Sequence, residues 1–155
     1  NTIGLRYFNI FGPNQSPNGP YAAVIPLYMN ALLRNTSGKI FGDGEQSRDF
    51  TFVENAIQAN IKAMLCEKTE AFGEAYNIAC GYKTSVNQLY NVLKEAANSD
   101  KNAEMCLPRV GDIRDSLADI SKAQNNFGYN PEVGIKEGLE ITLRWFKKEF
   151  YPQLN

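Results

Sequence analysis

The segment from Ile3 to Phe11 places the strongest constraint on the fold of this chain. It is rich in aromatic and branched residues, and it stops at the turn-forming run Gly12–Asn14. This pattern predicts a buried β-strand. A strand needs neighbours for its backbone donors and acceptors, so we expect its natural partners to lie in sequence that precedes these 155 residues. Without them the segment should rearrange, pair with a second copy of the chain, or leave Phe8, Ile10 and Phe11 exposed.

Helical and extended patterns alternate along the rest of the chain. We expect helices over residues 22–35, 53–68, 85–98, 121–128 and 134–150, and strands over 39–41, 48–52, 75–80 and 104–107. The helix over 53–68 carries Ile57, Ile61, Met64 and Leu65 on one face, and Ser85 and Ser121 each begin a capping-box pattern. This order predicts a mixed α/β fold, and the length fits the roughly 100–200 residues of one domain.

Charge and hydropathy narrow the range of partners. The chain holds 16 Lys and Arg against 17 Asp and Glu, so it has no excess of positive charge with which to bind a phosphate backbone. The longest apolar stretch, Tyr21 to Leu33, contains Pro26 and Asn30 and is shorter than the ~18–20 residues of a membrane span. We therefore expect neither a nucleic-acid nor a membrane partner, and we expect no secretory signal.

Cysteine and histidine usage restricts the chemistry. Three cysteines, Cys66, Cys80 and Cys106, form no C-x-x-C pair and argue against a disulfide framework or a zinc site, which favours a reducing, cytoplasmic location. The chain has no histidine, so Ser-His-Asp and Cys-His nucleophile systems are excluded. Catalysis would have to use Tyr, Lys or carboxylates.

The first candidate for binding chemistry is the glycine-containing turn and strand from Gly42 to Phe50. Its glycines permit close backbone approach, and Arg48 could present a fixed guanidinium to a phosphate. The alternative is a hairpin in which Arg48 is a surface residue paired with Asp49 or Glu45.

The second candidate is the loop Pro108–Asp115, in which cations and acids alternate around a glycine. Arg109 could meet a phosphate, and Asp112 could accept hydrogen bonds from both hydroxyls of a ribose. The alternative is a solvated loop of salt bridges. Two arginine-bearing loops make a diphosphate site more plausible than either one alone.

The third candidate lies where the first strand ends. Asn9 there offers both a donor and an acceptor at the carboxyl end of a strand, where α/β sheets bind ligands; the alternative is an Asn that caps the following turn. Residues Tyr21–Ile25 could pack an aromatic base on small side chains, or could simply begin a core helix.

Five blocks resemble the C-terminal half of the extended short-chain dehydrogenase/reductase family, the nucleotide-sugar epimerases and dehydratases. They are Leu5–Pro13, Tyr21–Pro26, Ile40–Val53, Tyr76–Ala79 and Arg109–Asp119, in the order and spacing of the family. Within it, Pro17–Pro26 and Ser116–Ala123 look most like the UDP-N-acetylglucosamine 4-epimerase group.

The resemblance implies roles for nine residues. Asn9 and Arg48 would contact the diphosphate, Ala23 and Val24 would line a uracil pocket, Arg109 would bind a phosphate oxygen, Asp112 would hold the uridine ribose, Ser116 would lie near the sugar substituent, and Tyr7 and Phe8 would sit beside the nicotinamide of NAD.

The same resemblance implies that this chain is a fragment. It would be the C-terminal, mixed α/β, substrate-binding portion of an extended Rossmann-type enzyme that lacks the N-terminal dinucleotide-binding half. Residues 1–13 would be the last part of the parent sheet, and residues 14–155 the UDP-sugar-binding domain. No G-x-G-x-x-G fingerprint occurs. We expect the Tyr-x-x-x-Lys pair to lie in the preceding half too, so no catalytic residue and no metal ligand is assigned here.

The implied function of the intact, homodimeric enzyme is NAD-dependent C4 epimerisation of a UDP-hexose, either UDP-GlcNAc/GalNAc or UDP-Glc/Gal. Two alternatives stay open. The intact enzyme could be a dehydratase or decarboxylase of the same family. The 155 residues alone could be an inactive, weak nucleotide-binding module.

Overall fold

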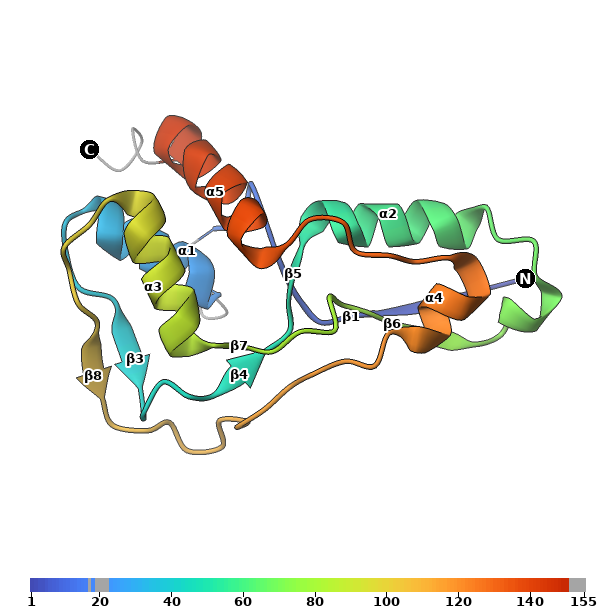
Figure 1. Cartoon of the computed structure of the whole chain (residues 1–155), viewed down its shortest axis with the longest axis horizontal. Helices are drawn as coiled ribbons and strands as arrows, with labels where there is room; N and C mark the ends of the chain where they lie inside the picture. The colour runs from blue at the N-terminus through green and yellow to red at the C-terminus, as the bar shows by residue number, and fades with distance from the viewer. Residues whose placement is uncertain (17, 19–22, 151–155) are drawn as a thin grey trace.

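The computed structural model describes residues 1–16, 18 and 23–150 as an elongated α/β molecule (Figure 1). Tyr21 and Ala22, where the predicted base-packing block and helix begin, lie outside the described residues. The elements are β1 (Gly4–Tyr7), β2 (Asn9–Phe11), α1 (Val24–Leu33), β3 (Lys39–Phe41), β4 (Ser47–Arg48), β5 (Phe50–Phe52), α2 (Val53–Met64), the 3₁₀ turn η1 (Thr69–Ala71), β6 (Ala75–Ile78), β7 (Thr84–Ser85), α3 (Val86–Ala97), β8 (Glu104–Cys106), α4 (Ser121–Phe127), α5 (Ile135–Trp145) and the π-helical turn η2 (Phe146–Phe150).

The predicted strand over Ile3–Phe11 is divided between two strand pairs. β1 runs parallel to β6, and β2 runs parallel to β5. The break falls at Phe8, whose N–H donates to the Ile78 oxygen while its own oxygen accepts the N–H of Ile10, so the chain bends there. The prediction of one buried strand is wrong for β1, which is mostly exposed. Of the three alternatives for an unpartnered segment, exposure does not apply to Phe11, which is buried, and β5 and β6 supply partners from within the chain.

The predicted strand over 48–52 also divides, at Asp49. Its carboxylate is fully buried and accepts the N–H groups of Cys80 at 2.8 Å, Gly81 at 2.9 Å and Ala118 at 3.4 Å. β4 on one side of Asp49 pairs antiparallel with β7, and β5 on the other pairs with β2. One side chain therefore joins three segments that are distant in sequence.

One core lies at the end of the molecule where α1, α3 and α5 come together (Figure 1). Tyr28 of α1 and Tyr90 of α3 meet edge to face with ring centroids 5.0 Å apart. Gly138 lets α5 approach the sheet closely, because a Cβ there would lie 2.9 Å from the rings of Phe11 and Phe52. At the start of α3 the capping box of Ser85 and Gln88 forms as predicted.

A second core is formed by buried residues of α2, β6 and α4, toward the other end of the molecule (Figure 1). α2 turns Asn55, Ala56 and Ala59 inward, not its larger apolar residues. Its stripe of Ile57, Ile61, Met64 and Leu65 is exposed, although such a stripe is typical of a buried face. The second predicted capping box is wrong: α4 is capped at Ile120, and the Asp119 carboxylate accepts the Ser121 N–H at 2.9 Å.

Candidate functional site

A cavity of about 590 Å³ opens between α1, the ends of β2 and β3, and the loop that follows β8. Six residues singled out from the sequence line it: Asn9, Ala23, Val24, Arg48, Arg109 and Asp112. They come from four segments far apart in the chain. Two small side chains, two guanidinium groups, one amide and one carboxylate thus share a space large enough for a small-molecule ligand.

Arg48 and Asp112 form an ion pair at the wall of this cavity. Arg48 Nη2 lies 2.6 Å from Asp112 Oδ1, while Nη1 donates to the backbone oxygens of Ile113 at 2.6 Å and Ser47 at 2.8 Å. The alternative pairing of Arg48 with Asp49 or Glu45 is wrong, because Asp49 is buried beneath backbone N–H groups. Three hydrogen bonds therefore fix the direction of the Arg48 guanidinium.

Arg109 is held by an aromatic ring. Its guanidinium carbon lies 3.8 Å from the centroid of the Phe41 ring at the end of β3, a cation–π contact. Nearby, the Tyr28 hydroxyl donates to the Lys39 oxygen at 3.1 Å. Burial raises the pKa of Tyr28 above its usual range, so the hydroxyl stays a neutral donor at ordinary pH.

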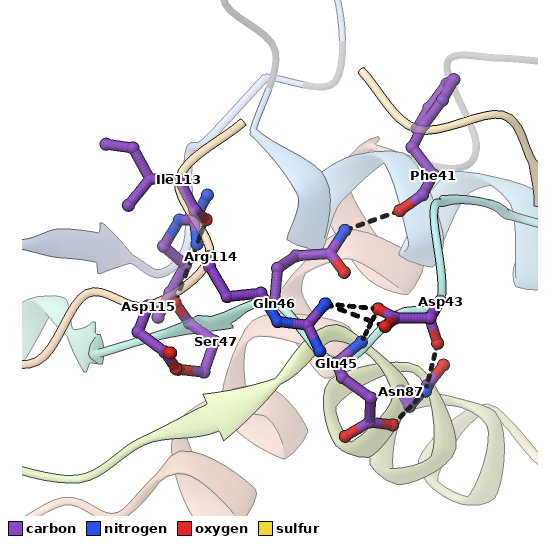
Figure 2. Close-up of polar contacts among 10 residues, drawn as sticks. Phe41, Asp43, Glu45, Gln46, Ser47, Asn87, Ile113, Arg114 and Asp115 are labelled. Carbon is purple, nitrogen blue, oxygen red and sulfur yellow. Dashed lines mark hydrogen bonds and ion pairs between the residues drawn. The ribbon is translucent and has the colours of Figure 1, made fainter. Parts of the chain in front are cut away.

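The loop after β8 carries the ion pairs that the salt-bridge alternative expected, but its acids and bases pair with other segments. Arg114 Nη1 contacts Asp43 Oδ1 at 2.7 Å and Oδ2 at 2.9 Å (Figure 2). Asp115 accepts from Ser47 Oγ at 2.5 Å and pairs with Lys83 at 3.2 Å. The Arg114 hydrogen bond lowers the pKa of Asp43, and the Ser47 hydroxyl is the main cause of the lowered pKa of Asp115.

Three of the predicted site residues lie apart from this cavity. Ser116 is half-buried and donates its N–H to the Ser47 oxygen at 3.1 Å. The Tyr7 ring is half exposed, and its hydroxyl donates to Asn60 Oδ1 at 2.9 Å. Phe8 packs against the second core.

Sequence reasoning did not select several residues that line the cavity, among them Gln15, Phe41 and Gln46. Gln46 Nε2 donates to the Phe41 oxygen at 2.8 Å and so ties the strand end to the following turn (Figure 2). Gln15 Oε1 is buried without a hydrogen-bond partner in the described part of the chain. The sequence features that could have indicated these residues are an aromatic residue at the end of a strand and polar residues in the loops that follow.

The resemblance places the catalytic Tyr-x-x-x-Lys pair in the preceding half, yet Tyr90 and Lys94 have this spacing within the chain. Both lie on α3, where Tyr90 is buried and donates its hydroxyl to the Lys101 oxygen at 3.3 Å. Lys94 Nζ instead donates to Asn102 Oδ1 at 2.7 Å. The tyrosine is a core residue that packs behind the lining residue Tyr28 and does not itself line the cavity, so the spacing here has a structural role.

Comparison with known proteins decides the family. Residues 1–79, half of the chain, match the family described as NAD dependent epimerase/dehydratase. The chain belongs to this family. A putative UDP-glucose 4-epimerase from Methanocaldococcus jannaschii is 37% identical over 143 residues, which are 92% of this chain and 45% of the relative.

Two solved structures of epimerases share the fold closely. One is the UDP-glucose 4-epimerase of Thermotoga maritima with UDP-glucose, at 40% identity and a TM-score of 0.87 over 94% of this chain and 46% of that one. The other is the UDP-N-acetylglucosamine 4-epimerase of Methanobrevibacter ruminantium with UDP-N-acetylmuramic acid, at 38% identity and a TM-score of 0.88 over 96% and 46%. The chain thus spans about half the length of these epimerase relatives.

The family is NAD-dependent, and of the two residues expected beside a nicotinamide only Tyr7 is exposed. Tyr7 presents a half-exposed aromatic ring that can lie against a flat ring, whereas Phe8 is used in core packing. Within the described ranges, no three His, Cys, Asp or Glu side chains gather as a metal ion would require. Nor does any helix there have the length and apolarity to cross a bilayer.

Proposed function

We propose that this chain binds the UDP part of a UDP-hexose for NAD-dependent C4 epimerisation by a longer polypeptide. The observation that carries the proposal is the convergence of Arg48, Arg109 and Asp112 on one cavity with small apolar side chains. The similarity to epimerase structures solved with UDP-glucose and with a UDP-N-acetylated sugar supports it.

Each proposed contact follows from the chemistry of the residue. Arg48 and Asn9 bind the diphosphate, since a guanidinium fork and an amide N–H₂ both donate to phosphate oxygens. Arg109 binds a further phosphate oxygen. Asp112 accepts hydrogen bonds from the two ribose hydroxyls, and the apolar side chains of Ala23 and Val24 line the part of the cavity that takes the uracil ring.

The mechanism assigned to this chain is positioning. When bound, NAD supplies reversible hydride transfer at C4 of the sugar. If the nucleotide and phosphates are fixed while the hexose is held loosely, the oxidised sugar can present either face. The arginines and Asp112 therefore orient the substrate and take no part in making or breaking covalent bonds. We assign no catalytic base to this chain, because Tyr90 is buried in the core and does not line the cavity.

The domain organisation is part of the proposal. Residues 1–13 continue a Rossmann sheet whose other strands precede this chain, and residues 14–155 bind the nucleotide sugar. The parallel pairing of β1 with β6 adds residues 75–78 to that sheet. Tyr7 and Phe8 then border the nicotinamide, and Ser116 lies toward the sugar substituent.

For the sugar, we propose a hexose of the GlcNAc/GalNAc or the Glc/Gal pair, and the blocks Pro17–Pro26 and Ser116–Ala123 favour the N-acetylated pair. One solved relative carries UDP-glucose and the other UDP-N-acetylmuramic acid, so both kinds of sugar enter the test. A dehydratase or decarboxylase of the same family is the second candidate, because the family description already joins epimerases and dehydratases.

Calorimetric titration of the 155-residue chain tests the proposal. UDP, UDP-GlcNAc and UDP-glucose should bind saturably, and Arg109→Ala should weaken UDP binding by about tenfold or more through loss of a charge-assisted hydrogen bond. Lys122→Ala, which removes an exposed cation paired with Glu74 away from the cavity, should leave binding unchanged. Absence of UDP binding by the folded chain would overturn the proposed function.

A further inference from the structure

The loop that carries Arg109 and Asp112 is not held by apolar packing. Leu107, Val110 and Ile113 are 87%, 105% and 63% exposed. A second hollow of about 520 Å³ adjoins the first cavity, with Arg109 and Asp112 lining both. Because open space lies on two sides of residues 107–113, the position of this loop depends on its polar contacts.

Some of those contacts lie where the proposed ligand would bind. Arg48 holds Asp112 and the Ile113 oxygen, and Phe41 holds Arg109, but Arg48, Asp112 and Arg109 themselves line the cavity. A bound diphosphate would draw on these same guanidinium groups. A loop contact that stays in place during binding has to come from outside the cavity.

Asp43 and Arg114 provide such a contact. Both line the second hollow and neither lines the first. One nitrogen of Arg114 contacts both oxygens of the Asp43 carboxylate, at 2.7 and 2.9 Å (Figure 2). The Arg114 backbone is fixed as well, since its oxygen accepts the Ser47 N–H at 2.8 Å. The pair joins the end of the loop to the turn after β3.

That turn is itself anchored to the start of α3. Asn87 Nδ2 donates to the Asp43 backbone oxygen at 2.9 Å and to Glu45 Oε1 at 2.6 Å (Figure 2). The Glu45 N–H donates to Asp43 Oδ1 at 2.9 Å and so directs the carboxylate. Gly44 has φ +75°, and a Cβ there would lie 2.1 Å from Asn87 Oδ1, so only glycine fits. The Asp43 carboxylate is thus presented from a rigid support.

We propose that Asp43 and Arg114 are positioning residues. They clamp residues 107–113 to the turn that follows β3, so that Arg109 and Asp112 face the nucleotide. This inference rests on the proposed function. The Asp43–Arg114 contact lies outside the ligand cavity and acts on affinity only through the placement of the loop.

Variants of Arg114 test the clamp in the 155-residue chain. Arg114→Ala should weaken UDP binding about five- to tenfold and speed amide exchange in residues 107–113, with the melting temperature almost unchanged because the pair is exposed. Arg114→Lys, which keeps a cation for Asp43, should recover most of the affinity, whereas Arg114→Gln should not. Lys122→Ala is the matched control, because its pair with Glu74 has a similar length and exposure.

A double variant separates positioning from general weakening of the fold. In an Arg109→Ala, Asp112→Ala background the groups to be positioned are gone, so adding Arg114→Ala should change UDP affinity by less than about twofold. An equal loss in both backgrounds would overturn the proposal, as would unchanged amide exchange in the Arg114→Ala loop. A folded wild-type chain that binds no UDP would instead overturn the proposed function, and with it the ligand role of the clamp.

Discussion

Arg48 and Asp112 neutralise each other at the cavity wall, across 64 positions of sequence and a distance of 2.6 Å. The side-chain exposures of 19% and 34% leave the pair within reach of solvent and of a ligand. An anion that enters the cavity competes with Asp112 for the guanidinium. Both groups are thereby kept oriented before any ligand arrives.

Arg48→Ala should separate phosphate recognition from nucleoside recognition. We expect UDP to bind about tenfold or more weakly, because the diphosphate loses a charge-assisted hydrogen bond. The affinity for uridine should fall by no more than about threefold, since Arg48 affects uridine only by orienting Asp112. Titration with uridine and UDP side by side measures both numbers, and equal losses for the two ligands would contradict the assignment.

The Asp43–Arg114 pair should respond to acid in a defined direction. The hydrogen bond from Arg114 lowers the folded-state pKa of Asp43 below its ordinary value of 3.8. The contribution of the ion pair to holding the loop is therefore fully present above pH 3.8 and is lost as pH falls through the lowered pKa. Amide exchange of residues 107–113, corrected for the intrinsic pH dependence, should be the same in the wild-type chain and Asp43→Asn well below pH 3.8 and differ above it. A difference that persists in strong acid would contradict this.

Asp49→Asn should destabilise the chain by roughly 2–4 kcal/mol. The substitution keeps the shape but replaces one acceptor oxygen with a donor that faces the N–H groups of Cys80, Gly81 and Ala118. Urea unfolding measures the loss of free energy. Asp100→Asn, at an exposed carboxylate, is the control and should be nearly neutral.

Gly138→Ala should cost about 1–2 kcal/mol of unfolding free energy even though alanine favours helix. The new Cβ would lie 2.9 Å from the rings of Phe11 and Phe52, both of which are buried and closely packed. Gly134→Ala, with open space around its Cβ, supplies the comparison by thermal unfolding. Equal melting temperatures for the two variants would show that the helix can withdraw from the sheet.

The sequence predicts those parts of the fold that depend on local pattern. The helix of Val86–Ala97, its Ser85 cap and the short strand Lys39–Phe41 all form as expected. The two divided strands could not be predicted, because the breaks at Phe8 and Asp49 depend on hydrogen bonds to residues 78–81. Such bonds leave no periodic signal in the sequence.

The candidate site shows the same division. Motif spacing selects six residues that line one cavity, and their proposed roles await the titrations above. It does not select Gln15 or Gln46, which reach the cavity through loop geometry. Periodicity also identifies the apolar stripe on α2, in which Ile57 and Met64 are exposed. It shows that one face of a helix is apolar, but not which element packs against that face.

Arg48 and Asp49 are consecutive residues with opposite surroundings, one at the cavity and one in the core. The buried carboxylate immobilises the backbone on which the guanidinium stands. The conformational entropy of that arginine is therefore lost when the chain folds and not when a ligand binds. We expect a cation that is ordered in this way to bind a ligand with only a small entropic penalty. Variants at Asp49 that still fold should bind with a less favourable entropy, because Arg48 would then be ordered only when the ligand binds.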